Sequence, residues 1–161
     1  MYGSDRPNLA IGDSGTYATL TTTRLNIAKF ATTNQMINNI TQAAELIQGG
    51  QPNKTTRKLG NNTYGRIEGD SVAIRLHSTD VVTFTTDNKV ILDTGGWSTV
   101  TTKARMNQYL PSGYGVYQHD YEWFIALPDG EPVEFPIRRL SAFSPTKHYA
   151  IINLNTGTLE A

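Results

Sequence analysis

The chain has 161 residues with 14 basic and 14 acidic side chains, so its formal net charge at pH 7 is zero. This length is typical of one domain, and the balanced charge indicates neither a strongly basic nucleic-acid-binding protein nor an acidic mimic of DNA. The absence of cysteine excludes disulfides, thiolate metal sites and cysteine nucleophiles. No apolar run approaches the roughly 18 residues that a membrane span needs, and the first residues lack the pattern of a signal peptide, so no membrane contact is expected.

Residues 1–24 are rich in Gly, Ser, Thr and Asp and are predicted to form an arm or a peripheral strand. Such an arm either docks on a neighbouring subunit or ends as a frayed terminus. Residues 25–161 are predicted to form a single domain. The first helix of this domain is expected to begin at an N-cap, Thr32 or Thr33, and to continue to Gln48, because apolar residues recur at helical spacing and a Gly-Gly pair follows.

Residues 51–66 are predicted to be a loop, because Pro52 and the sequence Gly-Asn-Asn at 60–62 interrupt any regular pattern. The segment contains no acid and four cations, Lys54, Arg57, Lys58 and Arg66. Two interpretations follow. The cations either pair with nearby carboxylates on a solvated loop, or they join Arg75, Lys103 and Arg105 in a surface that follows a phosphate backbone.

Alternation of apolar and polar residues predicts an antiparallel meander with strands at residues 71–77, 81–86 and 89–93 and turns at 78–80 and 87–88. This alternation places Arg75 and His77 on the same outer face. Gly95-Gly96 has the backbone freedom to end the meander with a sharp corner, and Trp97 follows as a large apolar anchor.

A second helix is predicted at residues 103–110, with Thr101 or Thr102 as its N-cap. Its buried stripe is expected to consist of Met106, Tyr109 and Leu110, and Pro111 ends it. Lys103 and Arg105 stay on the exposed side. A cation in the first turn opposes the helix dipole, and an anionic partner there would offset this. Four further strands are predicted, at residues 115–119, 121–127, 133–137 and 149–154.

The segments KTTRKLGNNTY, LHSTDVVTF, LDTGGW and TVTTKARMNQYLP, read in chain order, together resemble a family of small uncharacterised proteins that tailed bacteriophages encode, cyanophages included. The resemblance covers residues 54–123. It implies a phage origin and a setting either in the cytoplasm of an infected bacterial host or in the virion. It brings no catalytic residue with it.

The patterns together predict an α+β fold, in which an antiparallel twisted sheet of about five to seven strands carries two helices on one face. The function expected is that of a non-enzymatic phage accessory protein that binds a host or phage protein, with nucleic acid as an alternative partner. The residues expected to carry this binding are Lys54, Arg57, Lys58, Arg75, His77, Trp97, Lys103 and Arg105.

Two alternative functions are kept. One is a virion structural component, a homo-oligomer with residues 1–24 as an inter-subunit arm. The other is an RNase-like nuclease, in which His77 and His119 act as acid and base and Lys103 stabilises charge. No cofactor is expected. Gly95-Gly96 lacks the downstream lysine and hydroxyl of a phosphate-binding loop, so nucleotide hydrolysis is not supported. No metal site is expected either, because the spacing of the three histidines does not support zinc.

Overall fold

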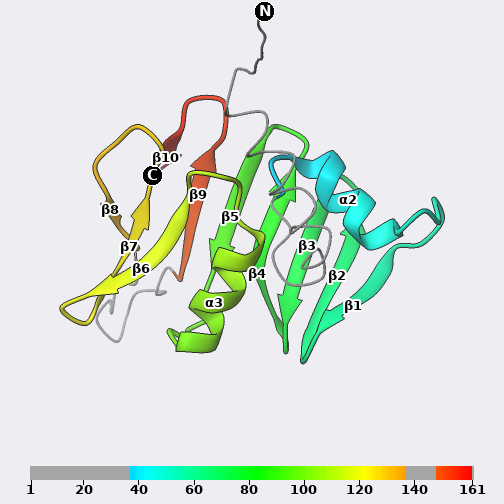
Figure 1. Cartoon of the computed structure of the whole chain (residues 1–161), viewed down its shortest axis with the longest axis horizontal. Helices are drawn as coiled ribbons and strands as arrows, with labels where there is room; N and C mark the ends of the chain where they lie inside the picture. Colours follow the sequence, from blue (N-terminus) through cyan, green and yellow to red (C-terminus); the bar gives the residue numbers. More distant parts are fainter. Residues whose placement is uncertain (1–36, 137–147, 161) are drawn as a thin grey trace, which may run out of the picture. The chain divides into compact units, whose positions relative to one another are not determined.

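The structure is a computed structural model that describes residues 37–136 and 148–160, all within one compact unit of the chain. The predictions for residues 1–24 and for Thr32 and Thr33 lie outside these residues. Seven antiparallel strands form the main sheet in the order β1-β2-β3-β4-β5-β9-β10 (Figure 1). Their bounds are Thr56–Gly60 for β1, Thr63–Glu68 for β2, Ser71–Leu76 for β3, Thr79–Thr85 for β4, Lys89–Asp93 for β5, Tyr149–Asn153 for β9 and Thr158–Glu160 for β10.

A second, three-stranded sheet contains β6 (Gly115–His119), β7 (Glu122–Ala126) and β8 (Val133–Glu134). Two helices are described, α2 (Ile40–Gln48) and α3 (Val100–Tyr109), and Figure 1 shows both in front of the main sheet. The predicted α+β class with an antiparallel sheet of up to seven strands is therefore confirmed. The separation of β6, β7 and β8 into their own sheet and the existence of β10 were not predicted.

A row of aligned residues on neighbouring strands forms the face of the main sheet that the helices cover. The row consists of Gly65, Ile74, Val82, Leu92 and Ala150, and all five residues are buried. Gly65 allows α2 to approach closely, because a Cβ atom there would lie only 2.6 Å from Cγ1 of the fully buried Ile47. The helix α2 therefore packs directly on the backbone of β2.

The predicted loop at residues 51–66 is wrong over most of its length, since β1 and β2 form a hairpin there. The turn is Asn61-Asn62, and Asn62 adopts a left-handed φ of 53° that asparagine tolerates. Inward positions of β1 are held by Leu59, which packs against the core, and by Arg57. An arginine at an inward position concealed the strand's alternation.

Both predicted helix starts are corrected. In α2 the N-cap is Asn39, whose Oδ1 accepts a hydrogen bond of 3.0 Å from the backbone N–H of Gln42, and the described residues before it are not helical. In α3 the N-cap is Thr99, and its Oγ1 accepts from the N–H of Thr102 at 3.1 Å. The predicted buried stripe of Met106, Tyr109 and Leu110 is confirmed.

The turn between β3 and β4 is also shorter than predicted. It consists of His77 and Ser78 alone, and Thr79 and Asp80 already belong to β4. The pairing shifts register between Ile74 and Arg75, and His77 adopts a left-handed φ of 54°. His77 therefore lies at the end of the sheet and does not share a strand face with Arg75.

Candidate binding site

The antiparallel meander brings three chain segments to one end of the main sheet. The strand β3 ends there, β4 starts there, and β5 runs back to the same end after its turn with β4. His77 lies in the first of these connections, and Trp97 follows β5 just before α3 begins. Two residues 20 positions apart in sequence are thereby placed around one cavity.

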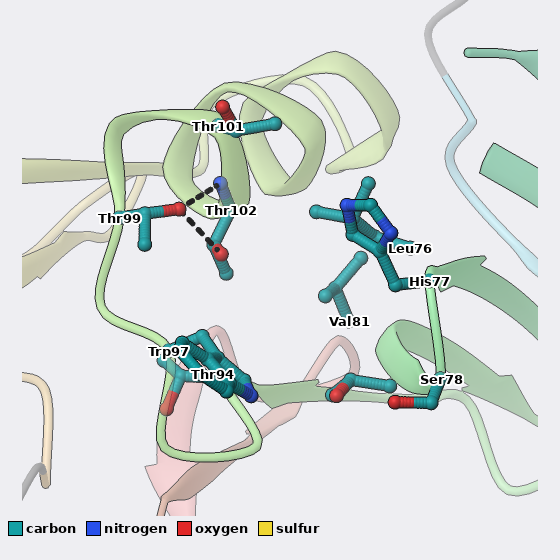
Figure 2. A pocket seen from close by; sticks show the side chains of 10 residues that line it. Leu76, His77, Ser78, Val81, Thr94, Trp97, Thr99, Thr101 and Thr102 are labelled. Atoms are coloured by element: carbon teal, nitrogen blue, oxygen red, sulfur yellow. Dashed lines mark hydrogen bonds between the residues drawn. The ribbon is translucent and has the colours of Figure 1, made fainter. Parts of the chain in front are cut away.

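The cavity has a volume of about 460 Å³, within the range of small-ligand sites. Figure 2 shows His77 and Trp97 on opposite sides of it, with Val81 between them. Trp97 is 68% exposed although it is a large apolar side chain. The lining is otherwise rich in hydroxyl groups, supplied by Ser78, Thr79, Thr94, Thr99, Thr101 and Thr102.

Hydrogen bonds within the chain fix the loop that carries Trp97. The buried Thr94 donates its N–H to the carbonyl of His148 at 2.8 Å and accepts from the N–H of Trp97 at 2.8 Å. The N–H of Thr99 in turn donates to the carbonyl of Trp97 at 2.9 Å. These bonds link the loop to the residue before β9 and to the cap of α3, so contacts within the chain fix this wall of the cavity.

Gly95 makes this loop possible. Its φ of 58° lies in the left-handed region, which favours glycine. A Cβ atom there would overlap Oγ1 of Thr79 and lie 2.7 Å from Cγ2 of the same residue. The glycine therefore lets the loop after β5 pack against the first residue of β4, which lines the cavity.

The amino-terminal end of α3 forms another wall. Thr99 caps the N–H of Thr102, and the two hydroxyls lie 3.0 Å apart (Figure 2). No acidic residue occurs in the first turn of the helix. Lys103 is directed at the second sheet, where its Nζ donates to Gln118 Oε1 at 3.1 Å and lies 5.2 Å from the ring centroid of Trp123. The positive end of the α3 dipole, which lies at the cavity, is thus not balanced by an acidic side chain in the first turn of the helix.

His77 is the only ionisable side chain among the residues that line the cavity. Its backbone N–H donates to the carbonyl of Asn62 at 2.8 Å, and its side chain is exposed. His119 and Lys103, the proposed partners of a nuclease site, do not line the cavity. His119 lies in β6 with its Nε2 3.5 Å from Asp120 Oδ2.

The predicted basic residues do not form one surface. Arg57 turns toward α2 and donates to the carbonyl of Leu46 at 2.7 Å. Arg105 donates from Nε to the buried Thr63 hydroxyl at 2.8 Å. Lys58 lies on the opposite face of the sheet, where its strand neighbour is Tyr64. Lys54 is in the connection between α2 and β1.

Arg75 is held in an ion-pair network on the face of the main sheet opposite the helices. Asp80 accepts from Arg75 Nε at 2.9 Å and from an amino group of Arg66 at 2.8 Å. Burial acts to raise the pKa of Asp80, but hydrogen bonds from the two arginines outweigh it and hold this pKa below its usual range. Arg66 also pairs with Glu68. The carboxylates therefore neutralise the cations of this network.

Among residues 37–136 and 148–160, no three His, Asp or Glu side chains gather as a metal site would require. None of the helices in the same residues is long and apolar enough to cross a membrane. Two of the residues expected to carry binding, His77 and Trp97, line the cavity, whereas its threonines were not among the predicted residues. The high frequency of threonine on either side of Gly95-Gly96 was the feature of the sequence that indicated them.

The fold and the cavity define a small α+β protein with a hydroxyl-lined pocket. Comparison with known protein families identifies the family of the chain. It belongs to the Kyanoviridae Gp96 protein family, a family of cyanophage proteins, whose model matches residues 32–141. The resemblance to phage proteins is thereby confirmed, and the match extends beyond residues 54–123 at both ends. No curated protein and no solved structure matches the chain significantly.

Proposed function

We propose that this phage protein is a non-enzymatic accessory protein that binds a protein partner in the cavity between His77 and Trp97. The observation that carries the proposal is the cavity of about 460 Å³ with an exposed tryptophan at its rim. Tryptophan is among the residues that contribute most to binding energy when a partner covers them. The setting is the cytoplasm of the infected host or the virion.

The composition of the lining favours binding over phosphodiester cleavage. General acid–base catalysis needs a proton donor and a proton acceptor that both reach the reacting group. Of the residues that line the cavity, His77 alone has an ionisable side chain, so the lining offers no acid–base pair. The hydroxyls of the lining suit hydrogen bonds to a bound polar group, which is what a binding pocket uses to orient its partner.

Charge favours a protein partner over nucleic acid. Affinity for a phosphate backbone comes chiefly from cations that replace counterions. Arg66 and Arg75 already have Asp80 as a partner at 2.8 and 2.9 Å, so a phosphate would have to compete with that carboxylate. Arg57 and Arg105 are likewise engaged by oxygens within the fold. Nucleic acid remains an outcome that the experiment distinguishes.

The test is a pulldown from lysate of infected cells, with and without nuclease treatment, and with the wild-type protein and two variants as bait. Trp97→Ala removes the tryptophan of the cavity, and Tyr64→Ala removes a 40% exposed aromatic side chain of the opposite sheet face as a matched control. We expect wild type and Tyr64→Ala to recover the same protein and Trp97→Ala to lose it.

Three results would overturn the proposal. Retention of the partner by Trp97→Ala would show that the cavity does not bind it. Loss of the partner in Tyr64→Ala alone would place binding on the opposite sheet face. Recovery that depends on omitting the nuclease would identify nucleic acid as the ligand.

A further inference from the structure

The tip of the β6–β7 hairpin is unusual in its backbone and its exposure. His119 and Glu122 face each other across the hairpin, so the turn consists of Asp120 and Tyr121. These residues have φ values of 49° and 70°, in a region that disfavours side chains with a Cβ and bulky ones most. A two-residue hairpin turn favours positive φ at both positions, but glycine, asparagine and aspartate are the usual residues there. Tyr121 is 93% exposed, so packing within the fold does not account for a tyrosine at this position.

Contacts between the two strands of the hairpin and with α3 hold this tip in place. Tyr117 and Phe124 stack across its two strands with ring centroids 5.6 Å apart. At its base, Asn107 of α3 donates to the carbonyl of Val116 at 2.8 Å and accepts from the N–H of Val116 at 2.7 Å. The strand β7 is anchored by the buried Trp123. An exposed aromatic side chain on a rigid support loses little conformational freedom when it binds.

The tip and the cavity are complementary in charge. Tyr121 is flanked by Asp120 and Glu122, both exposed. The cavity lies at the amino-terminal end of α3, which has no acid in its first turn, and it includes His77. A carboxylate that reaches this end of the helix is stabilised by the dipole.

The tip and the cavity are also complementary in chemistry. The indole of Trp97 offers an aromatic surface to a phenol ring, and the threonine hydroxyls offer hydrogen-bond partners to its OH group. A volume of about 460 Å³ is ample for one aromatic side chain. Tyr121 does not line the cavity of its own chain, so the contact is not made within one molecule.

We infer that the Tyr121 tip of one copy of this chain inserts into the cavity between His77 and Trp97 of a second copy. The inference rests on the proposed function, that the cavity binds a protein, and names the partner. Two arrangements satisfy this contact. In one, two copies exchange tips reciprocally and form a two-fold dimer. In the other, each pair leaves one tip and one cavity free, and repetition gives a closed ring or a growing chain.

The experiment is sedimentation velocity on the full chain from micromolar to sub-millimolar concentration. We expect wild type to form a dimer if the tips are exchanged reciprocally and larger species if they are not. Trp97→Ala and Tyr121→Gly should each weaken association about tenfold or more. The change Tyr121→Gly suits the left-handed turn, so misfolding does not explain a loss. Tyr64→Ala should associate as wild type does.

Mixing the two defective variants is the decisive step. Trp97→Ala retains an intact tip and Tyr121→Gly an intact cavity, so the mixture should form a 1:1 dimer and nothing larger. A wild type that stays monomeric, a Tyr121→Gly variant that still associates, or a mixture that stays monomeric would each overturn the inference. If Trp97→Ala still loses a different partner in the pulldown, the proposed function stands without self-association. If it retains every partner as well, both fail.

Discussion

Replacing Gly95 by alanine tests whether contact with Thr79 fixes the loop that forms one wall of the cavity. Gly95 has a φ of 58°, and a Cβ atom there would overlap Oγ1 of Thr79. Gly96 is a matched control next to it. It has a φ of 87°, but a Cβ atom at this position would find its nearest neighbour, His148 Nε2, at an ordinary 3.7 Å.

The two substitutions separate backbone strain from steric overlap. A left-handed conformation costs alanine about 1–2 kcal/mol, and Gly96→Ala should lower the free energy of unfolding by that amount. Overpacking typically adds about 1–3 kcal/mol, so Gly95→Ala should lower it by roughly 2–5 kcal/mol. In the double variant Gly95→Ala/Thr79→Ala, the overlapping atoms of Thr79 are gone, and the excess over Gly96→Ala should largely disappear.

The assay is urea unfolding followed by tryptophan fluorescence, with the four variants compared by linear extrapolation. The coupling between positions 79 and 95 follows from Thr79→Ala, Gly95→Ala and their combination. Equal destabilisation by Gly95→Ala and Gly96→Ala, or additive effects in the double variant, would refute the role assigned to Thr79.

Two further changes address the network and the hairpin. Asp80→Asn should destabilise the protein by about 1–2 kcal/mol at pH 7, because Arg66 and Arg75 lose their shared carboxylate. The pKa of Asp80 is lower in the folded than in the unfolded state. The contribution of Asp80 to the free energy of unfolding is therefore present above the unfolded-state pKa of about 3.9 and is lost as the pH falls through the folded-state pKa. The difference in this free energy between wild type and Asp80→Asn should shrink in urea unfolding at pH 3. Asn107→Ala should cost about 1–3 kcal/mol in the same assay, because the backbone N–H and carbonyl of Val116 lose their partner.

Each of these predictions has a control. Glu68→Gln changes a 55% exposed partner of Arg66 and should have an effect of about 0.5 kcal/mol or less. An undiminished effect of Asp80→Asn at pH 3 would contradict the linkage. Asn155→Ala removes an exposed side-chain bond to Asn88 and should be nearly neutral. A similar loss in Asn107→Ala and Asn155→Ala would show that Asn107 does not anchor the hairpin.

The strands of the meander could be predicted because their apolar residues alternate at a period of two. The helix starts could not, because capping residues are too frequent. Around α3, Ser98, Thr99, Thr101 and Thr102 are all N-cap residue types, and only the hydrogen bond to Thr99 Oγ1 identifies the true cap. The hairpin of β1 and β2 was missed for a related reason. Arg57 occupies an inward position of β1 and donates a hydrogen bond to the carbonyl of Leu46. No local sequence pattern reveals this contact.

The candidate site was only partly predictable. His77 and Trp97 could be selected as residues, and the topology of a three-strand meander already places both connections at the same end of the sheet. The cations could not be assigned, because whether a cation is free depends on cross-strand partners. Arg75 pairs with Asp80 only because a register shift at residue 75 aligns the two.

The pairing of β5 with β9 has a consequence for how the chain folds. The strands from β1 to β5 each pair with a near neighbour in sequence, whereas Asp93 pairs with Tyr149, 56 positions later. Such a contact closes a long loop and is expected to form late. Until residues 149–153 have left the ribosome, the backbone edge of β5 beside Val90 and Leu92 has no strand to pair with. Nascent chains in which β9 has not yet emerged therefore expose an unpaired strand edge, the feature that favours aggregation.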